Sequence, residues 1–317
     1  MKKVLSGNEA VALGVYENGV RFASAYPGTP STEILENYAK YDGVYAEWAP
    51  NEKVALEVGV GASMAGARVL VTMKHVGLNV AADPFMTLTY TGVNGGFLLV
   101  CADDPGMHSS QNEQDNRIYG RFAQVPVFEP SDSQEAKDMV AEAYDISEKF
   151  DTPSMMRMTT RISHSKGVVE VSEESPIVRE AYGFKKDREK YTMIPAYARK
   201  KHPQILKRVE GLLEYVESTP LNRVEMGDTK VGIITSGISY QYVKEVMPNA
   251  SVLKLGVTYP LSEKLIKDFA NKVEKLFVVE ELEPYLEDSI KAMGIAVEGK
   301  KYFSILDELS QDLVAKG

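Results

Sequence analysis

The chain has 317 residues, of which 44% are hydrophobic and 26% charged, and its formal net charge is −9. The length predicts about two domains of ordinary size, and the composition is typical of a globular protein. The acidic excess argues against phosphate-backbone binding as the main activity, and no run of about 18 apolar residues predicts a membrane span. The single cysteine, Cys101, excludes an internal disulfide or cysteine-ligated cluster. We expect a cytoplasmic protein, because the amino terminus is not typical of a secretory signal.

The first 165 residues alternate short apolar runs with helical segments. Near-continuous apolar runs are typical of parallel strands that are buried on both faces. We predict strands at 21–25, 44–48, 68–73, 96–102, 125–129 and 154–160, and helices at 8–17, 30–39, 52–66, 81–91 and 132–149. This alternation predicts a doubly wound α/β layer over residues 1–165.

The pattern weakens after residue 165 and recovers near residue 230. We expect residues 166–228 to be a linker with a long helix at 203–218. Within it, residues 185–208 hold nine Lys or Arg and two acidic residues, a local excess of +7. This basic segment is either a solvated surface or a docking site for a partner. A smaller α/β unit is predicted over 229–317, with strands at 231–235, 251–255 and 275–280 and helices at 239–247, 262–272, 284–293 and 305–314.

Glu52 is the candidate catalytic residue. It follows Asn51, a natural N-cap, at the start of a predicted helix with glycine at positions 59, 61 and 66. Glycine in a helix interior costs roughly 1 kcal/mol against alanine, which a chain accepts where another backbone or a flat ligand must come close. Glu52 is therefore a proton relay for a buried cofactor, or it merely complements the helix dipole as first-turn acids often do.

Three other polar segments are predicted to lie with Glu52 at the carboxyl edge of the sheet, where open α/β sheets bind ligands. In the segment 25–34, Thr29 and Pro30 open a predicted helix. The other two are 73–79, which carries Lys74, His75 and Asn79, and the long loop 101–122. Each segment also has an ordinary interpretation. Thr29 and Pro30 would be a routine helix start, Lys74 and His75 would be surface residues, and the third segment would be a mobile loop. Their coincidence at one edge favours a site, but the four histidines share no ligand spacing, so no metal site is predicted.

The motifs at this edge resemble the 2-oxoacid:ferredoxin oxidoreductases. They are YPGTPST (26–32), PNEKVALEVGVGASMAGAR (50–68), KHVGLNVAADP (74–84) and CADDPGMHSSQNEQDNR (101–117). The resemblance covers essentially the whole chain and is closest to the large subunit of the family members that act on indolepyruvate. It implies oxidative decarboxylation of an aryl pyruvate to an acyl-CoA on thiamine diphosphate, with electrons passed to ferredoxin.

The resemblance also implies roles for the cofactor-binding residues. Residues 1–165 are similar to a pyrimidine-binding domain, in which Glu52 would hydrogen-bond the N1′ atom of the aminopyrimidine and favour its imino tautomer. Pro27, Gly28 and Thr29 match the turn that lies beside the cofactor and the substrate carboxylate.

Substrate binding is expected to differ from that of the pyruvate-cleaving relatives. Those proteins have an arginine soon after the fourth strand, where this sequence has Ala102 followed by two aspartates. Lys74, His75 and Asn79 are the expected substrate-binding substitutes, and the missing arginine would suit a bulkier aromatic substrate.

The family's large subunit normally continues into a diphosphate-binding domain with a GDG motif and a cysteine-rich ferredoxin-like segment, which we do not find in these 317 residues. The segment GDTKVG (227–232) is not that motif, because Thr229 replaces the second glycine. Mg²⁺ and [4Fe–4S] clusters are therefore expected only on segments or subunits absent from this chain. Residues 229–317 resemble the C-terminal domain of transketolase.

The expected partners are a β subunit and either a diphosphate-binding domain or a second protomer, in an oligomer that uses ferredoxin and coenzyme A indirectly. Neither nucleic acid nor a membrane is expected as a partner. The alternative is a non-catalytic assembly or regulatory module that docks through residues 185–208. A dehydrogenase-like protein is disfavoured, because no GxGxxG motif follows the first strand.

Overall fold

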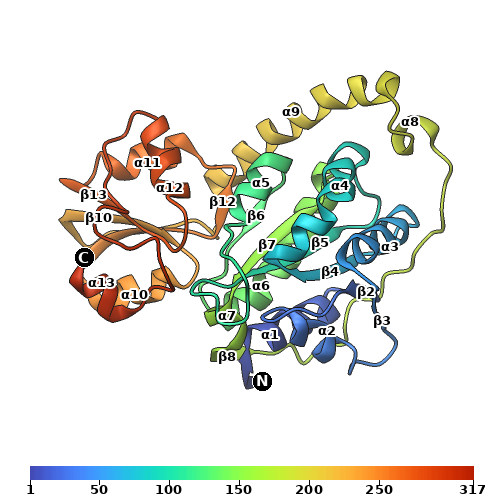
Figure 1. Cartoon of the computed structure of the whole chain (residues 1–317), viewed down its shortest axis with the longest axis horizontal. Helices are drawn as coiled ribbons and strands as arrows, with labels where there is room; N and C mark the ends of the chain where they lie inside the picture. The colour runs from blue at the N-terminus through green and yellow to red at the C-terminus, as the bar shows by residue number, and fades with distance from the viewer.

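The computed structural model describes residues 1–317, which form two α/β units linked by a long helix along one side (Figure 1). The larger sheet has seven strands in the order β12-β6-β7-β5-β4-β2-β3. Six of them run parallel, as predicted: β2 (Phe22–Ala25), β3 (Tyr45–Trp48), β4 (Val69–Lys74), β5 (Phe97–Asp103), β6 (Val127–Phe128) and β7 (Ser154–Thr159). The antiparallel edge strand β12 (Val257–Tyr259) comes from the C-terminal third of the chain.

Helices cover both faces of this sheet, which explains why its strands are apolar throughout. Along β5, Leu98 and Val100 belong to one buried cluster, whereas Leu99 and Cys101 belong to another on the opposite face. The first face is covered by α1 (Gly7–Glu17), α2 (Thr32–Tyr38) and α6 (Ser133–Phe150), and the second by α3 (Glu52–Met64), α4 (His75–Thr91) and α5 (Arg117–Ala123).

The second unit is built on a four-stranded sheet in the order β13-β10-β11-β9. Its elements are β9 (Arg223–Glu225), β10 (Asp228–Ser236), β11 (Ala250–Leu255), β13 (Lys275–Val279), α10 (Ser239–Val246), α11 (Glu263–Ala270), α12 (Tyr285–Ala292) and α13 (Gln311–Lys316). The remaining elements are β1 (Lys2–Ser6), β8 (Lys166–Glu170), α7 (Thr160–His164), α8 (Arg188–Tyr191) and α9 (Pro195–Ser218). No helix is both long enough and apolar enough to span a membrane.

Several predicted boundaries are wrong for identifiable reasons. The helix predicted at 30–39 begins only at Thr32, so Thr29 and Pro30 precede it. The helix predicted from residue 203 starts eight residues earlier and contains Pro203. The final helix does not begin at residue 305, because Asp307 has a left-handed backbone (φ 64°) and the Ser310 side chain caps a later start at Gln311.

Other elements were not predicted. The strands β1 and β8 pair antiparallel from Lys2–Glu170 to Ser6–Lys166, beneath the larger sheet in the view of Figure 1. The segment 101–122 is not wholly a loop, since it contains part of α5. Helix α4 starts at His75, six residues before the prediction, and Lys74 makes no side-chain cap that would mark this start.

The basic segment 185–208 is partly used inside the protein. Lys190 donates to the carbonyl of Val93 at 2.8 Å and to Asp151 at 3.0 Å. Arg208 on α9 donates to the same Asp151 at 2.8 Å and to the carbonyl of Thr89 at 2.7 Å. These two cations therefore fasten α8 and α9 to the first unit.

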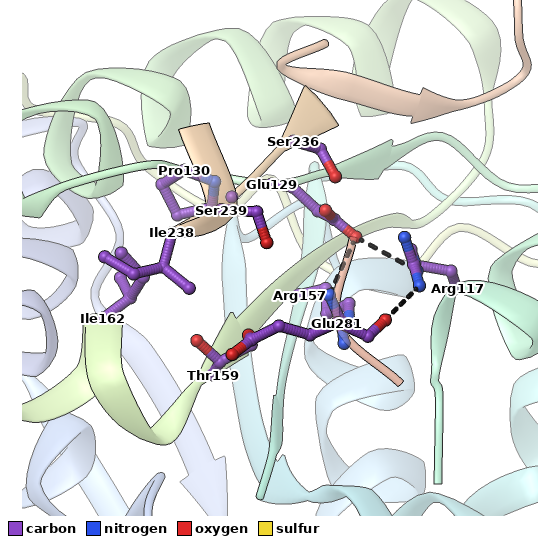
Figure 2. A pocket seen from close by; sticks show the side chains of 11 residues that line it. Arg117, Glu129, Pro130, Arg157, Thr159, Ile162, Ser236, Ile238, Ser239 and Glu281 are labelled. Carbon is purple, nitrogen blue, oxygen red and sulfur yellow. Dashed lines mark hydrogen bonds and ion pairs between the residues drawn. The ribbon is translucent and has the colours of Figure 1, made fainter. Parts of the chain in front are cut away.

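A buried cluster of charges joins the two units (Figure 2). Arg117 at the start of α5 donates to Asp115 and, across the junction, to Glu280 at 2.8 Å and to the carbonyl of Glu281 at 3.0 Å. The side chain of Arg117 is only 1% exposed. Removal of one partner from a buried ion pair typically costs about 3–5 kcal/mol, because it leaves an uncompensated charge.

Arg157 on β7 forms the other half of this charge cluster. It donates to Asp103 at 2.5 Å and to Glu129 at 3.2 Å, and all three side chains are buried. Burial raises the pKa of Asp103 despite the attraction of Arg157. Burial also raises the pKa of Glu281 to about 7, although Arg157 and the backbone N–H of Leu309 favour the charged form.

The raised pKa of Glu281 predicts a pH-dependent stability. Its ordinary value is 4.5 and its folded value is about 7, so the folded state retains the proton more strongly than the unfolded state. The stability that this group contributes is complete below about pH 4.5 and is lost as the pH rises through about 7, by at most about 3 kcal/mol. We expect Glu281→Gln to remove this loss, as measured by urea unfolding between pH 5 and pH 8.

The exposed neighbour Glu283 provides a matched control, since Glu283→Gln should leave the pH dependence unchanged. Parallel pH profiles for wild type and Glu281→Gln would contradict the prediction.

Candidate functional site

Glu52 is nearly buried and lacks a partner within the chain. Its helix α3 is capped by Asn51, whose side chain accepts a hydrogen bond from the N–H of Val54 at 3.0 Å. The Glu52 side chain is 8% exposed, yet it takes part in none of the hydrogen bonds or ion pairs of the structure. Because a buried carboxylate is costly without hydrogen bonds, this side chain is prepared for a donor from outside the chain.

Gly77 on α4 makes room for this carboxylate. A Cβ atom added at Gly77 would lie 2.5 Å from Oε1 of Glu52, too close for any side chain unless the carboxylate moved. Cys101 on β5 lies nearby, and burial raises the pKa of its thiol well above the usual value, with smaller contributions from the charges of Asp103 and Glu52. The carboxylate therefore lies between two helices and above a thiol that stays protonated.

The turn after β2 contacts the end of β4. A Cβ atom on Gly28 would lie 3.0 Å from Cδ of Lys74, so the apolar stem of the lysine packs across this glycine. The ammonium group of Lys74 donates to the carbonyl of Ser109 at 3.0 Å, and the Ser109 hydroxyl donates to the carbonyl of Thr29 at 3.1 Å. Burial lowers the pKa of Lys74. Pro27 and Thr29 are exposed beside this contact.

His75 and Asn79, by contrast, have partners on the loop and helix that follow β5. The His75 side chain is fully buried, and its Nε2 atom lies 2.9 Å from the carbonyl oxygen of Asn112. Asn79 is exposed and accepts a hydrogen bond from the Tyr119 hydroxyl at 2.6 Å. The structure therefore places Lys74 and Asn79 at the surface of the edge and His75 beneath the loop.

Asp103 and Asp104, at the end of β5, fix the loop 104–116. Asp104 accepts from the Ser109 N–H at 2.8 Å and from the hydroxyls of Ser110 and Thr160 at 2.6 Å each. Burial alone would raise the pKa of Asp104, but these hydrogen bonds outweigh it and lower the pKa. Asp103 accepts from the backbone and side chain of Asn116 at the other end of the loop.

The carboxyl edge holds no deep cleft beside Glu52. A groove lined by Trp48, Pro50 and Val54, among others, has a volume of about 90 Å³. This is well below the roughly 300–1,000 Å³ of pockets that enclose drug-sized ligands. The carboxyl edge of the sheet is therefore a shallow surface, and a second domain or subunit could complete the site.

Some residues of the site were missed from the sequence. Gly77, Ser109, Asn112 and Tyr119 contact predicted site residues, and none was singled out. Only Gly77 carried a usable signal, because a glycine two residues after His75 indicates a place where another group comes close to the backbone. The other three act through contacts that depend on how the loop folds back.

Comparison with known proteins identifies the fold and the family. The family model described as pyruvate flavodoxin/ferredoxin oxidoreductase, thiamine diphosphate-binding, matches residues 13–219. The indolepyruvate oxidoreductase subunit IorA of Archaeoglobus fulgidus is 48% identical over 312 residues, which are 94% of this chain and 50% of that protein. The chain spans about half the length of that protein and of the IorA subunits of Pyrococcus horikoshii and Pyrococcus abyssi.

Solved structures agree with this fold. The 2-oxoglutarate:ferredoxin oxidoreductase from Magnetococcus marinus superposes with a TM-score of 0.80 at 18% identity, over 99% of this chain and 64% of that chain. A split-gene transketolase, described as an inactive β4 tetramer, superposes with a TM-score of 0.60 at 12% identity, over 92% of this chain and 86% of that chain. At these identities the two structures establish the α/β fold alone. Because the family model covers well over half of its residues, the chain belongs to the thiamine diphosphate-binding pyruvate flavodoxin/ferredoxin oxidoreductase family.

Proposed function

We propose that this chain is the pyrimidine-activating portion of an indolepyruvate:ferredoxin oxidoreductase. The observation that carries the proposal is Glu52, a nearly buried carboxylate that has no partner in the chain and faces the glycine at position 77. Its relatives at 41–48% identity are indolepyruvate oxidoreductase subunits, which supports an aryl pyruvate as substrate. The proposed domains are 1–165, 166–228 and 229–317.

The residues of this edge fit thiamine diphosphate. The absence of a side chain at Gly77 lets the Glu52 carboxylate lie against α4, and this carboxylate needs a hydrogen-bond donor such as a protonated ring nitrogen. Thiamine diphosphate, when bound, supplies a carbon nucleophile that adds to the keto carbon of a 2-oxoacid. Glu52 would exchange a proton with the pyrimidine ring as a general acid and base, while Pro27, Gly28 and Thr29 would line the adjoining surface.

Lys74 is the proposed anchor for the substrate carboxylate. It places a positive charge beside the turn that carries Thr29, whereas the aspartates at positions 103 and 104 are engaged elsewhere. Asn79 is exposed and remains a candidate for a polar contact with substrate. His75 would reach the substrate only if the loop that covers it moved, so we assign it mainly to holding Asn112.

The magnesium and diphosphate half of the site would come from a β subunit, a diphosphate-binding domain or a second protomer. The open edge and its exposed aromatic side chains, Tyr26 and Trp48, support such a partner. We propose that ferredoxin and coenzyme A act on the assembled enzyme and that any [4Fe–4S] clusters lie outside this chain.

The proposed function makes a prediction about cofactor binding. Calorimetric titration with thiamine diphosphate and Mg²⁺ should give little or no heat for the chain alone and a saturable signal when a diphosphate-domain partner is present. The reason is that the chain offers only the pyrimidine side of the site. Tight binding to the isolated chain would contradict the proposed division of the site.

The second prediction concerns the acid and base. In the reconstituted complex, Glu52→Gln should lower the rate of indolepyruvate decarboxylation by about 10²–10⁴-fold, the usual contribution of a positioned acid or base. Glu57→Gln, an exposed change on the same helix, is the matched control and should retain the rate. An active Glu52→Gln complex would favour the alternative of a non-catalytic assembly module.

The third prediction uses the slot itself. Gly77→Ala should displace the Glu52 carboxylate and lower the decarboxylation rate at least tenfold, with little loss of fold because the contacted atom ends a flexible side chain. Gly61→Ala is the control, because its Cβ would meet no atom within 4 Å. That variant should keep full activity and gain up to about 1 kcal/mol of stability.

A further inference from the structure

A groove without any apolar side chain lies where α7, the loop 104–116 and the second unit meet. It is lined by six residues, His108, Thr160, Arg161, His164, Ser165 and Glu308, and its volume is about 260 Å³. This volume is below the range of about 300–1,000 Å³ that drug-sized ligands occupy, yet it is ample for a single oxyanion. None of these six residues has a role in the function proposed above.

Arg161 and Ser165 bring hydrogen-bond donors to this groove. Arg161 on α7 is about half exposed and uses Nη2 to donate to Glu308, and the Tyr242 hydroxyl also lies beside its guanidinium, which leaves part of its five N–H donors for another acceptor. The Ser165 hydroxyl takes part in no hydrogen bond within the chain, whereas the Thr160 hydroxyl is already committed to Asp104. A guanidinium fork beside a free hydroxyl suits the tetrahedral oxygens of phosphate.

Two histidines extend the positive side of the groove. Nε2 of His108 lies 3.6 Å from Oε2 of Glu308, and Nε2 of His164 lies 3.7 Å from Oε2 of Glu33. Both rings are about half exposed and gain a positive charge when protonated. Arg161, His108 and His164 therefore line one small volume although they come from two different segments.

Glu308 shows that two of these side chains, Arg161 and His108, converge on an anion. It belongs to the second unit, and its carboxylate contacts both Arg161 and His108. A surface ion pair of this kind contributes little to stability, about 0–1 kcal/mol, so another anion can replace it at low cost. The Glu308 carboxylate thus occupies the position that the negative group of a ligand would take, and it competes with that ligand.

We propose that this groove binds a phosphate group, with Arg161, His108, His164 and Ser165 as its donors. Glu308 competes for Arg161 and His108 and is displaced when phosphate binds. The proposal is independent of the thiamine chemistry, so either one can fail without the other.

The test uses the complete chain and its four histidines as reporters. The C2–H resonances are followed by NMR at a fixed pH of about 6.5, while sodium phosphate replaces sodium chloride at constant ionic strength. We expect the signals of His108 and His164 to shift along one saturable curve. The signals of His202 on α9 and of buried His75 should stay unchanged.

Three variants sharpen the result. Arg161→Gln should weaken phosphate binding at least tenfold, and Glu308→Gln should strengthen it several-fold by removing the competing carboxylate. Arg199→Gln, an exposed change on α9, is the matched control and should not alter binding. The Glu308 variant keeps the test decisive even if the Arg161 variant folds poorly.

The source of the phosphate is distinguished by a second titration with 3′-adenosine monophosphate. A larger effect than with inorganic phosphate identifies a phosphate ester as the ligand class, and an equal effect identifies free phosphate. A linear response without saturation, an equal response of all exposed histidines, or unchanged binding in both the Arg161 and Glu308 variants would overturn the proposal.

Discussion

The ion pairs of Arg117 and Arg157 are the constraint on which the rest of the structure depends. Arg157 holds Asp103 at the end of β5, and Arg117 holds Asp115 close to the start of α5. The loop between these two aspartates is therefore fixed at both ends. Because Arg117 also binds Glu280, the same charges position the second unit. Replacement of Arg117 would leave Glu280 without its cation across the junction, and replacement of Arg157 would do the same to Asp103 within the first unit.

The carboxylates near the candidate site differ in role because their partners differ. Asp104 accepts hydrogen bonds from the N–H of Ser109 and from two hydroxyls, so its charged form is stabilised and it shapes the loop. Glu52 is equally close to the carboxyl edge but accepts none. A carboxylate whose lone pairs are all occupied is a poor proton carrier, whereas one with free lone pairs in a nearly dry slot is available for exchange.

Local patterns in the sequence were enough to predict the sheet and the position of Glu52. The apolar runs predict buried parallel strands, and Asn51 predicts a helix start that points Glu52 to the carboxyl edge. The start of α4 at His75 was not predictable in this way, because Lys74 offers no capping side chain. The part of α9 before Pro203 was missed because proline is normally a strong local signal of a break.

The surroundings of the site were less predictable, because they depend on contacts between distant residues. The slot for Glu52 is formed by Gly77 on the next helix, and the cover over His75 is a carbonyl from Asn112. The partner of Arg117 at Glu280 is 163 residues away in the sequence. None of these pairs has a fixed spacing that a motif could record. These contacts depend on the order of the strands in the sheet, which decides which distant segments become neighbours.

The cost of leaving Glu52 without a partner is itself informative about function. A stable scaffold would place a polar group in that slot or an apolar residue at position 52, since an unsatisfied buried carboxylate reduces stability. This chain instead keeps the carboxylate and removes the side chain opposite it at Gly77. The unpartnered carboxylate reduces the stability of the isolated chain, and that cost is removed if a ring with a hydrogen-bonding nitrogen reaches it from outside the chain. The arrangement is therefore easier to explain as half of a catalytic site than as a structural module.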